Sequence, residues 1–203
     1  NYPDYVKSGS IDGNQFGISV SGAGDVNGDG YDDIIIGSNS VGFESNGKAD
    51  IFLGGANMDT VADVTMYEQQ TGTRYGETVS KIGDINSDGY DDVIVGDMDY
   101  NSYIGRAYIY YGGANMNNGI DLILSGSSAS QFGHSFAPAK DINGDGYSDL
   151  AVGARSYGSG LGRVYIYYGG PAVDNIADVI LQGFVTGEEF GNGLASGDVN
   201  GDG

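Results

Sequence analysis

Short apolar segments separated by glycine-rich turns recur along this chain at a nearly constant interval. A three-residue apolar run that ends in glycine recurs at 34–36, 93–95 and 150–152. A segment rich in β-branched and aromatic residues follows at 48–53, 106–111 and 163–168, and another at 62–67, 121–125 and 178–182. None of them repeats its apolar residues every 3.6 positions, so the pattern predicts strands instead of helices.

A nine-residue polar motif precedes each apolar run. It reads Asp-x-Asn-x-Asp-Gly-Tyr-x-Asp in three copies, at 25–33, 84–92 and 141–149, and a fourth copy begins at Asp198. The first residues of the copies, Asp25, Asp84, Asp141 and Asp198, are 59, 57 and 57 positions apart. A period of this size is typical of stacked or radially arranged supersecondary units.

Each interval also contains an aromatic-glycine pair and a short segment before the polar motif, which makes four strand-like segments per repeat. Four-stranded sheets repeated radially form a β-propeller. We therefore expect an all-β chain of propeller blades with four antiparallel strands, with three full blades plus partial blades at both ends. The expected units are an outer strand at 1–15, full blades at 16–74, 75–131 and 132–189, and a truncated blade at 190–203. Because the fourth copy of the motif stops at its sixth position, we expect a fragment of a longer propeller.

The polar motif carries the oxygen ligands that a hard cation requires. Asp25, Asn27 and Asp29 alternate along a tight loop and can converge on one ion, and Gly30 permits the positive φ that the curl demands. Tyr31 offers its backbone carbonyl and Asp33 a final carboxylate. Six or seven oxygens at about 2.3–2.6 Å suit Ca²⁺ better than Mg²⁺. We predict about one Ca²⁺ per blade, held by Asp25, Asn27, Asp29, Tyr31, Asp33, Asp84, Asn86, Asp88, Tyr90, Asp92, Asp141, Asn143, Asp145, Tyr147, Asp149, Asp198, Asn200 and Asp202.

Other readings of the motif are weaker. A helix–loop–helix calcium site starts with the same residues but needs a glutamate at position 12 and flanking helices. Position 12 here is Ile36, Val95 or Val152, inside the apolar run. An ordinary Asp/Asn/Gly turn would leave three carboxylates repelling one another without a cation. The chain has no Cys and one His, which excludes a zinc or copper site with soft ligands.

Composition narrows the class of partner. The 203 residues include 8 basic and 28 acidic side chains, a net charge of −20, which excludes a general nucleic-acid or anionic-membrane binder. No apolar stretch approaches the length of a membrane span. Calcium loops of this kind are saturated where calcium is millimolar, so we expect an extracellular or cell-surface protein.

The repeats resemble the FG-GAP repeat, the blade unit of the integrin α-subunit propeller and of many bacterial and archaeal surface proteins. The Phe-Gly pair stands at 16–17, 132–133 and 190–191, with Tyr75 replacing Phe in the second unit, and the cation motif matches in all three complete copies. The Gly-Ala-Pro end is replaced by Gly37-Ser38-Asn39 and its counterparts, which argues for a generic member over a close integrin relative. The resemblance implies that calcium rigidifies the hairpin between the first two strands of each blade.

We expect an extracellular calcium-binding FG-GAP propeller that serves in adhesion or surface assembly and binds a protein partner or a surface glycan. The alternatives are a carbohydrate-binding or carbohydrate-processing propeller and a subunit of an extracellular filament or tube, self-assembled through open blade edges. His134 is the only histidine and no catalytic or nucleotide motif is present, so we expect no enzyme. We interpret Lys48, Arg106 and Arg163, which open equivalent strands, and the tyrosines of those strands as structural.

Overall fold

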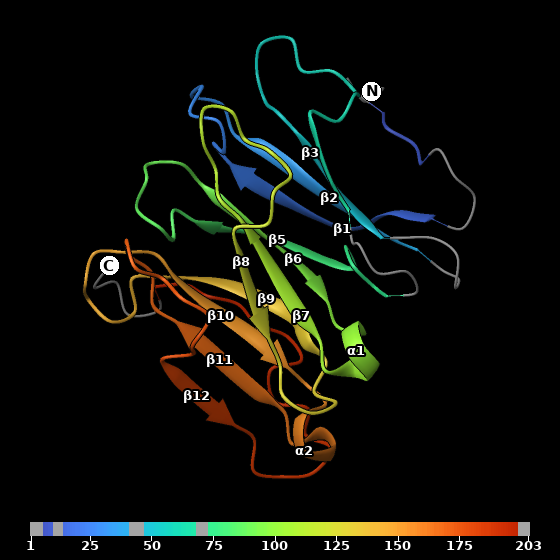
Figure 1. Ribbon diagram of the computed structural model, residues 1–203, viewed down its shortest axis with the longest axis vertical. Helices are drawn as coiled ribbons and strands as arrows, with labels where there is room; N and C mark the ends of the chain where they lie inside the picture. Colours follow the sequence, from blue (N-terminus) through green and yellow to red (C-terminus); the bar gives the residue numbers. More distant parts are fainter. Residues whose placement is uncertain (1–5, 10–13, 41–46, 68–72, 199–203) are drawn as a thin grey trace.

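The computed structural model describes residues 6–9, 14–40, 47–67 and 73–198, and its regular secondary structure is almost all β-strand (Figure 1). Three four-stranded antiparallel sheets follow one another along the chain, each with its strands hydrogen-bonded in sequence order. The first sheet contains β1 (Asn14–Gly24), β2 (Asp33–Ser40), β3 (Lys48–Phe52) and β4 (Val64–Tyr67). The second contains β5 (Thr78–Gly83), β6 (Asp92–Asp97), β7 (Arg106–Tyr110) and β8 (Leu122–Ser125). The third contains β9 (Phe132–Lys140), β10 (Asp149–Ala154), β11 (Arg163–Tyr167) and β12 (Val179–Gln182). The predicted fold class is confirmed.

The apolar runs become the second strand of each sheet, and their burial follows from the neighbouring sheets. Every residue of β6 is buried, because the second sheet lies between the other two. The run in β2 is only partly buried: Ile35 is fully covered, whereas Ile34 and Ile36 point to the outer face of the first sheet and are intermediate. An inner strand apolar at every position is the pattern of a strand covered on both faces.

Two hydrophobic cores join the sheets in pairs. Ile35, Ile51 and Met66 of the first sheet pack with Val95 and Tyr108 of the second. Ile94, Ile109 and Leu124 on the other face of the second sheet pack with Val152 and Tyr165 of the third. The hydroxyls of Tyr75 and Tyr110 are 2.6 Å apart within the first core, so these buried phenols satisfy each other.

The two ends of the stacked sheets carry different connections (Figure 1). The polar motifs form the turns between the first and second strands, at the left of the view. The opposite end carries α1 (Tyr100–Tyr103) and α2 (Tyr157–Gly160), each a single turn in which three residues have positive φ. These turns connect the second and third strands of the second and third sheets.

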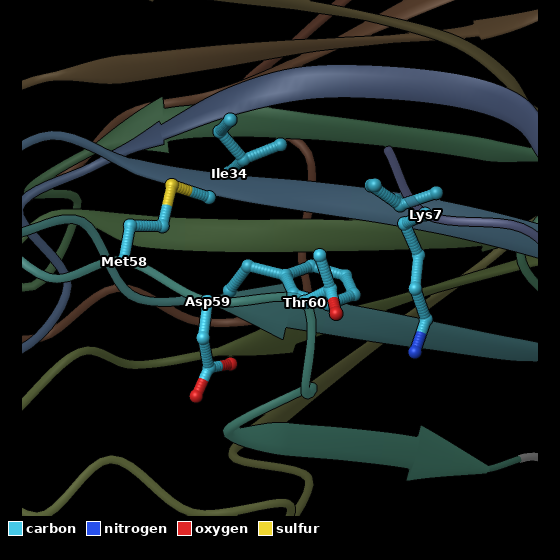
Figure 2. A pocket seen from close by; sticks show the side chains of 7 residues that line it. Lys7, Ile34, Met58, Asp59 and Thr60 are labelled. Atoms are coloured by element: carbon cyan, nitrogen blue, oxygen red, sulfur yellow. The ribbon is translucent and has the colours of Figure 1, made fainter. Parts of the chain in front are cut away.

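The outer face of the first sheet holds a shallow apolar pocket (Figure 2). Lys7 lies over the ring of Phe52, with its Nζ 6.0 Å from the ring centroid, and Met58 closes another side. Residues 6–9 have no regular structure, and the rest of the strand expected near the N-terminus lies outside the described residues. Within the described ranges, no helix has the length and apolarity required to cross a membrane.

Candidate functional site

The first polar motif folds into a tight loop around the carboxylate of Asp25. Its Oδ1 accepts hydrogen bonds from the backbone N–H of Gly28 at 2.7 Å and Asp29 at 3.0 Å, and its Oδ2 accepts one from Gly30 at 2.8 Å. The side chain of Asp29 in turn accepts the N–H of Tyr31 at 3.0 Å. Gly28 and Gly30 have φ of +76° and +90°, a conformation that costs glycine little.

The other two complete motifs adopt the same loop. Asp84 accepts the N–H of Asp88 and Gly89, and Asp141 accepts those of Gly144, Asp145 and Gly146. In all three loops the third-position asparagine donates from Nδ2 to the fifth-position aspartate, at 2.7–2.9 Å. The first, third and fifth positions are therefore brought together three times, although Val26 is replaced by isoleucine in both later motifs and Gly28 by Ser87 in the second.

The ninth-position aspartates have a different environment. Asp33, Asp92 and Asp149 are buried, at 1%, 0% and 0% exposure. One carboxylate oxygen of each accepts the backbone N–H of the motif's second residue: Val26, Ile85 and Ile142, at 2.8–2.9 Å. The other oxygen accepts an N–H from the glycine that follows the third strand: Gly54, Gly112 and Gly169, at 2.7–2.9 Å. This residue thus ties the loop to the end of the third strand in every sheet.

The electrostatics show that the carboxylates of each loop influence one another. Burial raises the pKa of Asp33, its two backbone hydrogen bonds oppose that rise, and the charges of Asp29 and Asp25 add to it. The same causes, in the same order, raise the pKa of Asp92 to about 7 and raise the pKa of Asp149. Bringing a cation to such a loop would favour the charged form of all three carboxylates.

The chemical types of the donors in each loop suit a hard cation, although the side chains are not oriented around a common centre. Among the described residues, no three His, Cys, Asp or Glu side chains are arranged to hold a metal ion by themselves. The motif, however, also offers an amide oxygen and a backbone carbonyl, and an ionised carboxylate has about four lone-pair positions, so an oxygen that accepts an N–H can still bind a cation. All donors are oxygens, as Ca²⁺ prefers. The residues present therefore fit Ca²⁺ chemically.

The fourth copy of the motif is only partly visible. Asp198 is described, whereas Asn200 and Asp202 lie outside the described residues. Its aromatic-glycine pair is in place, because Phe190 forms a parallel bridge with Gly162 just as Phe132 does with Gly105.

Two sets of aspartates matter to this end of the molecule although they lie outside the predicted ligand sets. One closes the turn between the third and fourth strands, where Asp63, Asp121 and Asp178 accept the N–H of Leu53, Tyr111 and Tyr168 at 2.7–2.8 Å. Their fixed place before each fourth strand was a visible sequence signal. The other is Asp91, at position 8, which contacts the loop of the preceding repeat.

The cationic strand-opening residues have mixed roles. Lys48 forms an ion pair with Asp50, as expected for a structural lysine. Arg106 and Arg163 instead stack on tyrosines, with the guanidinium carbon 3.8 Å from the ring centroid of Tyr100 and 3.4 Å from that of Tyr157. These three residues therefore do not form a ring of free cations for an acidic ligand.

The strand tyrosines and the histidine also make contacts within the fold. Tyr108 and Tyr165 are 2% and 7% exposed and belong to the two cores, so they offer no platform for a sugar. The Nδ1 of His134 is 3.3 Å from the Met98 sulfur and its Nε2 is 2.8 Å from the Asn192 side-chain oxygen. Burial lowers the pKa of His134, and the charge of Arg155 lowers it further.

Comparison with known proteins places these repeats in a family. The family model described as "FG-GAP repeat" matches residues 16–72 and 132–167. The chain carries FG-GAP repeats. The residues between the matches form a sheet with the same strand order and the same loop.

Several curated proteins that are similar to this chain are integrin α subunits. The chain is 32% identical to integrin alpha-PS3 of Drosophila melanogaster over 180 residues, which is 83% of this chain and 16% of that protein. It is 32% identical to integrin alpha-5 of Xenopus laevis over 185 residues (86% and 17%) and 34% identical to integrin alpha-6 of Homo sapiens over 170 residues (76% and 14%). The chain thus spans about a sixth of the length of these relatives.

Proposed function

We propose that this chain is part of an extracellular FG-GAP propeller that serves in cell adhesion or surface assembly, with Ca²⁺ stabilising its blades. The observation that carries the proposal is the loop of the polar motif, which folds alike in three repeats and brings acidic and amide side chains together. The similarity to integrin α subunits supports the adhesion role. Adhesion modules of this kind bind and do not catalyse, and we propose no enzymatic activity.

We propose that the first, third, fifth and ninth residues of each motif and the carbonyl of the seventh hold the ion. In the first loop these are Asp25, Asn27, Asp29, Asp33 and Tyr31. Bound Ca²⁺ would supply positive charge among three carboxylates that otherwise repel one another. The chain's own residues do the rest: Asp33 and its counterparts tie the loop to the third strand, which keeps the first two strands in register.

Calorimetry with and without EDTA tests the calcium proposal. A ligand that binds only the native state at 100 times its Kd adds about 2.7 kcal/mol per site, so chelation should lower the melting temperature by several degrees. The matched control replaces the fifth-position ligand in all three loops (Asp29→Asn, Asp88→Asn and Asp145→Asn). That variant should lose its response to EDTA. A parent protein that melts at the same temperature in calcium and in EDTA would contradict the proposal.

We propose that the partner, a protein or a surface glycan, binds at the end of the sheets opposite the cation loops. Connections there differ between repeats, and α1 presents Tyr103 at 53% exposure. A glycan array with a reducing-end assay separates the two classes of partner. Glycan binding or turnover would favour the carbohydrate alternative over protein adhesion.

Assembly of copies into a filament or tube is a second candidate, and the outer face of the third sheet favours it. Leu181 of β12 is 44% exposed there, whereas its counterparts Met66 and Leu124 are fully covered by the next sheet. An apolar sheet face of this kind is stabilised when another sheet covers it. Light scattering in calcium at high concentration tests the idea, and a monomeric mass would count against it.

A further inference from the structure

We infer that Asp91 is a positioning residue for the cation loop of the preceding repeat, which makes the first loop differ from the second. The inference rests on the proposed calcium sites. Asp91 is at position 8 of the second motif, where the predicted ligand set has no member. Its Oδ2 accepts the backbone N–H of Asp25 at 3.0 Å, and its own N–H donates to the backbone carbonyl of Asp25 at 3.2 Å. Asp91 therefore holds the main chain on both sides of the Cα of the first ligand in the neighbouring loop.

Lys81 and Gly24 complete this contact. The Nζ of Lys81 lies 2.8 Å from Asp91 Oδ2, so one carboxylate oxygen receives both the lysine and the Asp25 N–H. The positive charge of Lys81 offsets the repulsion between Asp91 and the acidic loop. Gly24 makes the approach sterically feasible, because a Cβ there would lie 2.0 Å from Asp91 Oδ2 and 2.5 Å from Lys81 Nζ. At this junction the two side chains have opposite charges, and the glycine leaves room for both of them.

The junction between the second and third repeats lacks this clamp. Ser148 stands where Asp91 would be and Pro138 where Lys81 would be, so the ion pair cannot form there. Both junctions keep a simpler contact, in which Gly113 donates to the carbonyl of Val26 at 2.8 Å and Gly170 to that of Ile85 at 2.7 Å. The difference between the two junctions is therefore the clamp on the first ligand.

The clamp acts on the first ligand of the first loop, although Asp91 itself lies outside the proposed ligand set. A residue that orients a ligand without touching the metal commonly contributes 10–100-fold to metal affinity. We expect the first loop to bind Ca²⁺ more tightly than the second.

Site-resolved titration of the whole chain with CaCl₂ tests the inference. The amides of Gly30, Gly89 and Gly146 each donate to the first aspartate of one loop, so their NMR shifts report the three loops separately. Asp91→Ser, which copies the residue of the second junction, should weaken the Gly30 response about tenfold and leave Gly146 unchanged. Asp91→Asn keeps an acceptor for the Asp25 N–H but loses the charge paired with Lys81, so it should weaken the response less.

Asp32→Ser is the matched control, because Asp32 has the same position in the first motif but is exposed. It removes the same charge and should leave all three titrations unchanged, which separates the clamp from a general loss of acidity. A parent-like Gly30 titration in Asp91→Ser would overturn the inference.

A second readout does not require the metal. In EDTA, the backbone amide of Asp25 should exchange with solvent about tenfold faster in Asp91→Ser than in the parent, because its acceptor is gone. Unchanged exchange would overturn the clamp. If the parent shows no calcium response while this exchange difference is present, the calcium proposal fails and the clamp stands as a purely structural contact.

Discussion

The two ends of the sheets contrast in how they use their side chains. At the cation-loop end, equivalent positions hold the same residue in three repeats, and their carboxylates accept backbone N–H groups with nearly the same geometry: Asp33, Asp92 and Asp149 are the clearest case. At the opposite end, the residue after the aromatic-glycine pair changes from Ile18 to Glu77, His134 and Asn192. There Glu77 accepts from Asn39 of the preceding sheet, and His134 contacts Met98 and Asn192.

This difference distinguishes residues that the fold requires from residues that are free to vary. A carboxylate that satisfies two buried backbone donors cannot be exchanged without exposing their unmet hydrogen-bonding demand, so its identity is dictated by the fold. Side chains that pair with each other across a junction can change together while the backbone stays the same. Variation at the end with α1 and α2 therefore leaves the blades intact, which is what the partner site proposed there would require.

The largest effect is expected from a substitution at the cation-loop end. Asp92→Ala leaves the N–H groups of Ile85 and Gly112 without their acceptor in a fully buried site, which should destabilise the protein by about 3–5 kcal/mol. Urea unfolding in EDTA measures it without a contribution from metal. The control is Arg74→Ala at the opposite end, whose ion pairs involve a side chain that is 49% exposed and should contribute less than about 1 kcal/mol. Equal losses in the two variants would break the comparison.

Two glycines, one at each end of the sheets, refine the comparison between the ends. Gly17 and Gly24 both have positive φ, at +82° and +77°, so alanine is strained at either site by about 1–2 kcal/mol. A Cβ on Gly17 meets nothing within 4 Å, whereas one on Gly24 would collide with Asp91 and Lys81. Gly24→Ala should therefore cost about 1 kcal/mol more than Gly17→Ala in thermal unfolding, which is the range of a lost hydrogen bond. A larger loss at Gly17 would contradict the role assigned to the clamp.

The arginine–tyrosine stacks at the opposite end offer a stabilising test. Arg163 Nε donates to Gln182 at 2.8 Å, but the corresponding Nε of Arg106 is buried without a hydrogen-bond partner, because Ser125 stands where Gln182 would be. Ser125→Gln should raise the free energy of unfolding by about 0.5–1.5 kcal/mol. The control is Ser125→Gln combined with Arg106→Lys, in which the gain should disappear. A gain that persists in the double variant would show that the glutamine acts elsewhere.

The smallest expected effect is a pH dependence at His134. Burial and the charge of Arg155 lower the pKa of His134 in the folded state, whereas the hydrogen bond to Asn192 and the charges of Glu77 and Glu189 oppose this. Because the unfolded state then binds the proton more readily, the contribution of His134 to stability is present above about pH 6.5 and falls as the pH drops through that value. His134→Asn, which places the residue of the next repeat there, should lose less stability than the parent between pH 7 and about pH 5.5. Urea midpoints that fall in parallel would contradict this.

Much of the fold followed from the sequence because the repeat makes each inference three times over. The period near 57 residues, the four strand-like segments and the glycine turns predicted the three four-stranded sheets, and Phe16, Phe132 and Phe190 marked the family. The loop conformation around Asp25, Asp84 and Asp141 was also predictable, because spacing and glycine positions limit how so short a loop can curl. Local chemistry was sufficient for these features.

The tertiary structure decided the contacts between repeats and between distant turns. Asp33 reaches Gly54, Asp63 reaches Leu53, and Asp91 reaches Asp25, and no spacing rule links such pairs before the strands are paired and the sheets are stacked. The same holds for burial: Leu124 and Leu181 occupy equivalent positions, yet only the first is covered. Sequence determined the blade and its loop because both are local. The clamp on the first loop was decided by a neighbour, since Asp91 belongs to the repeat that packs beside that loop.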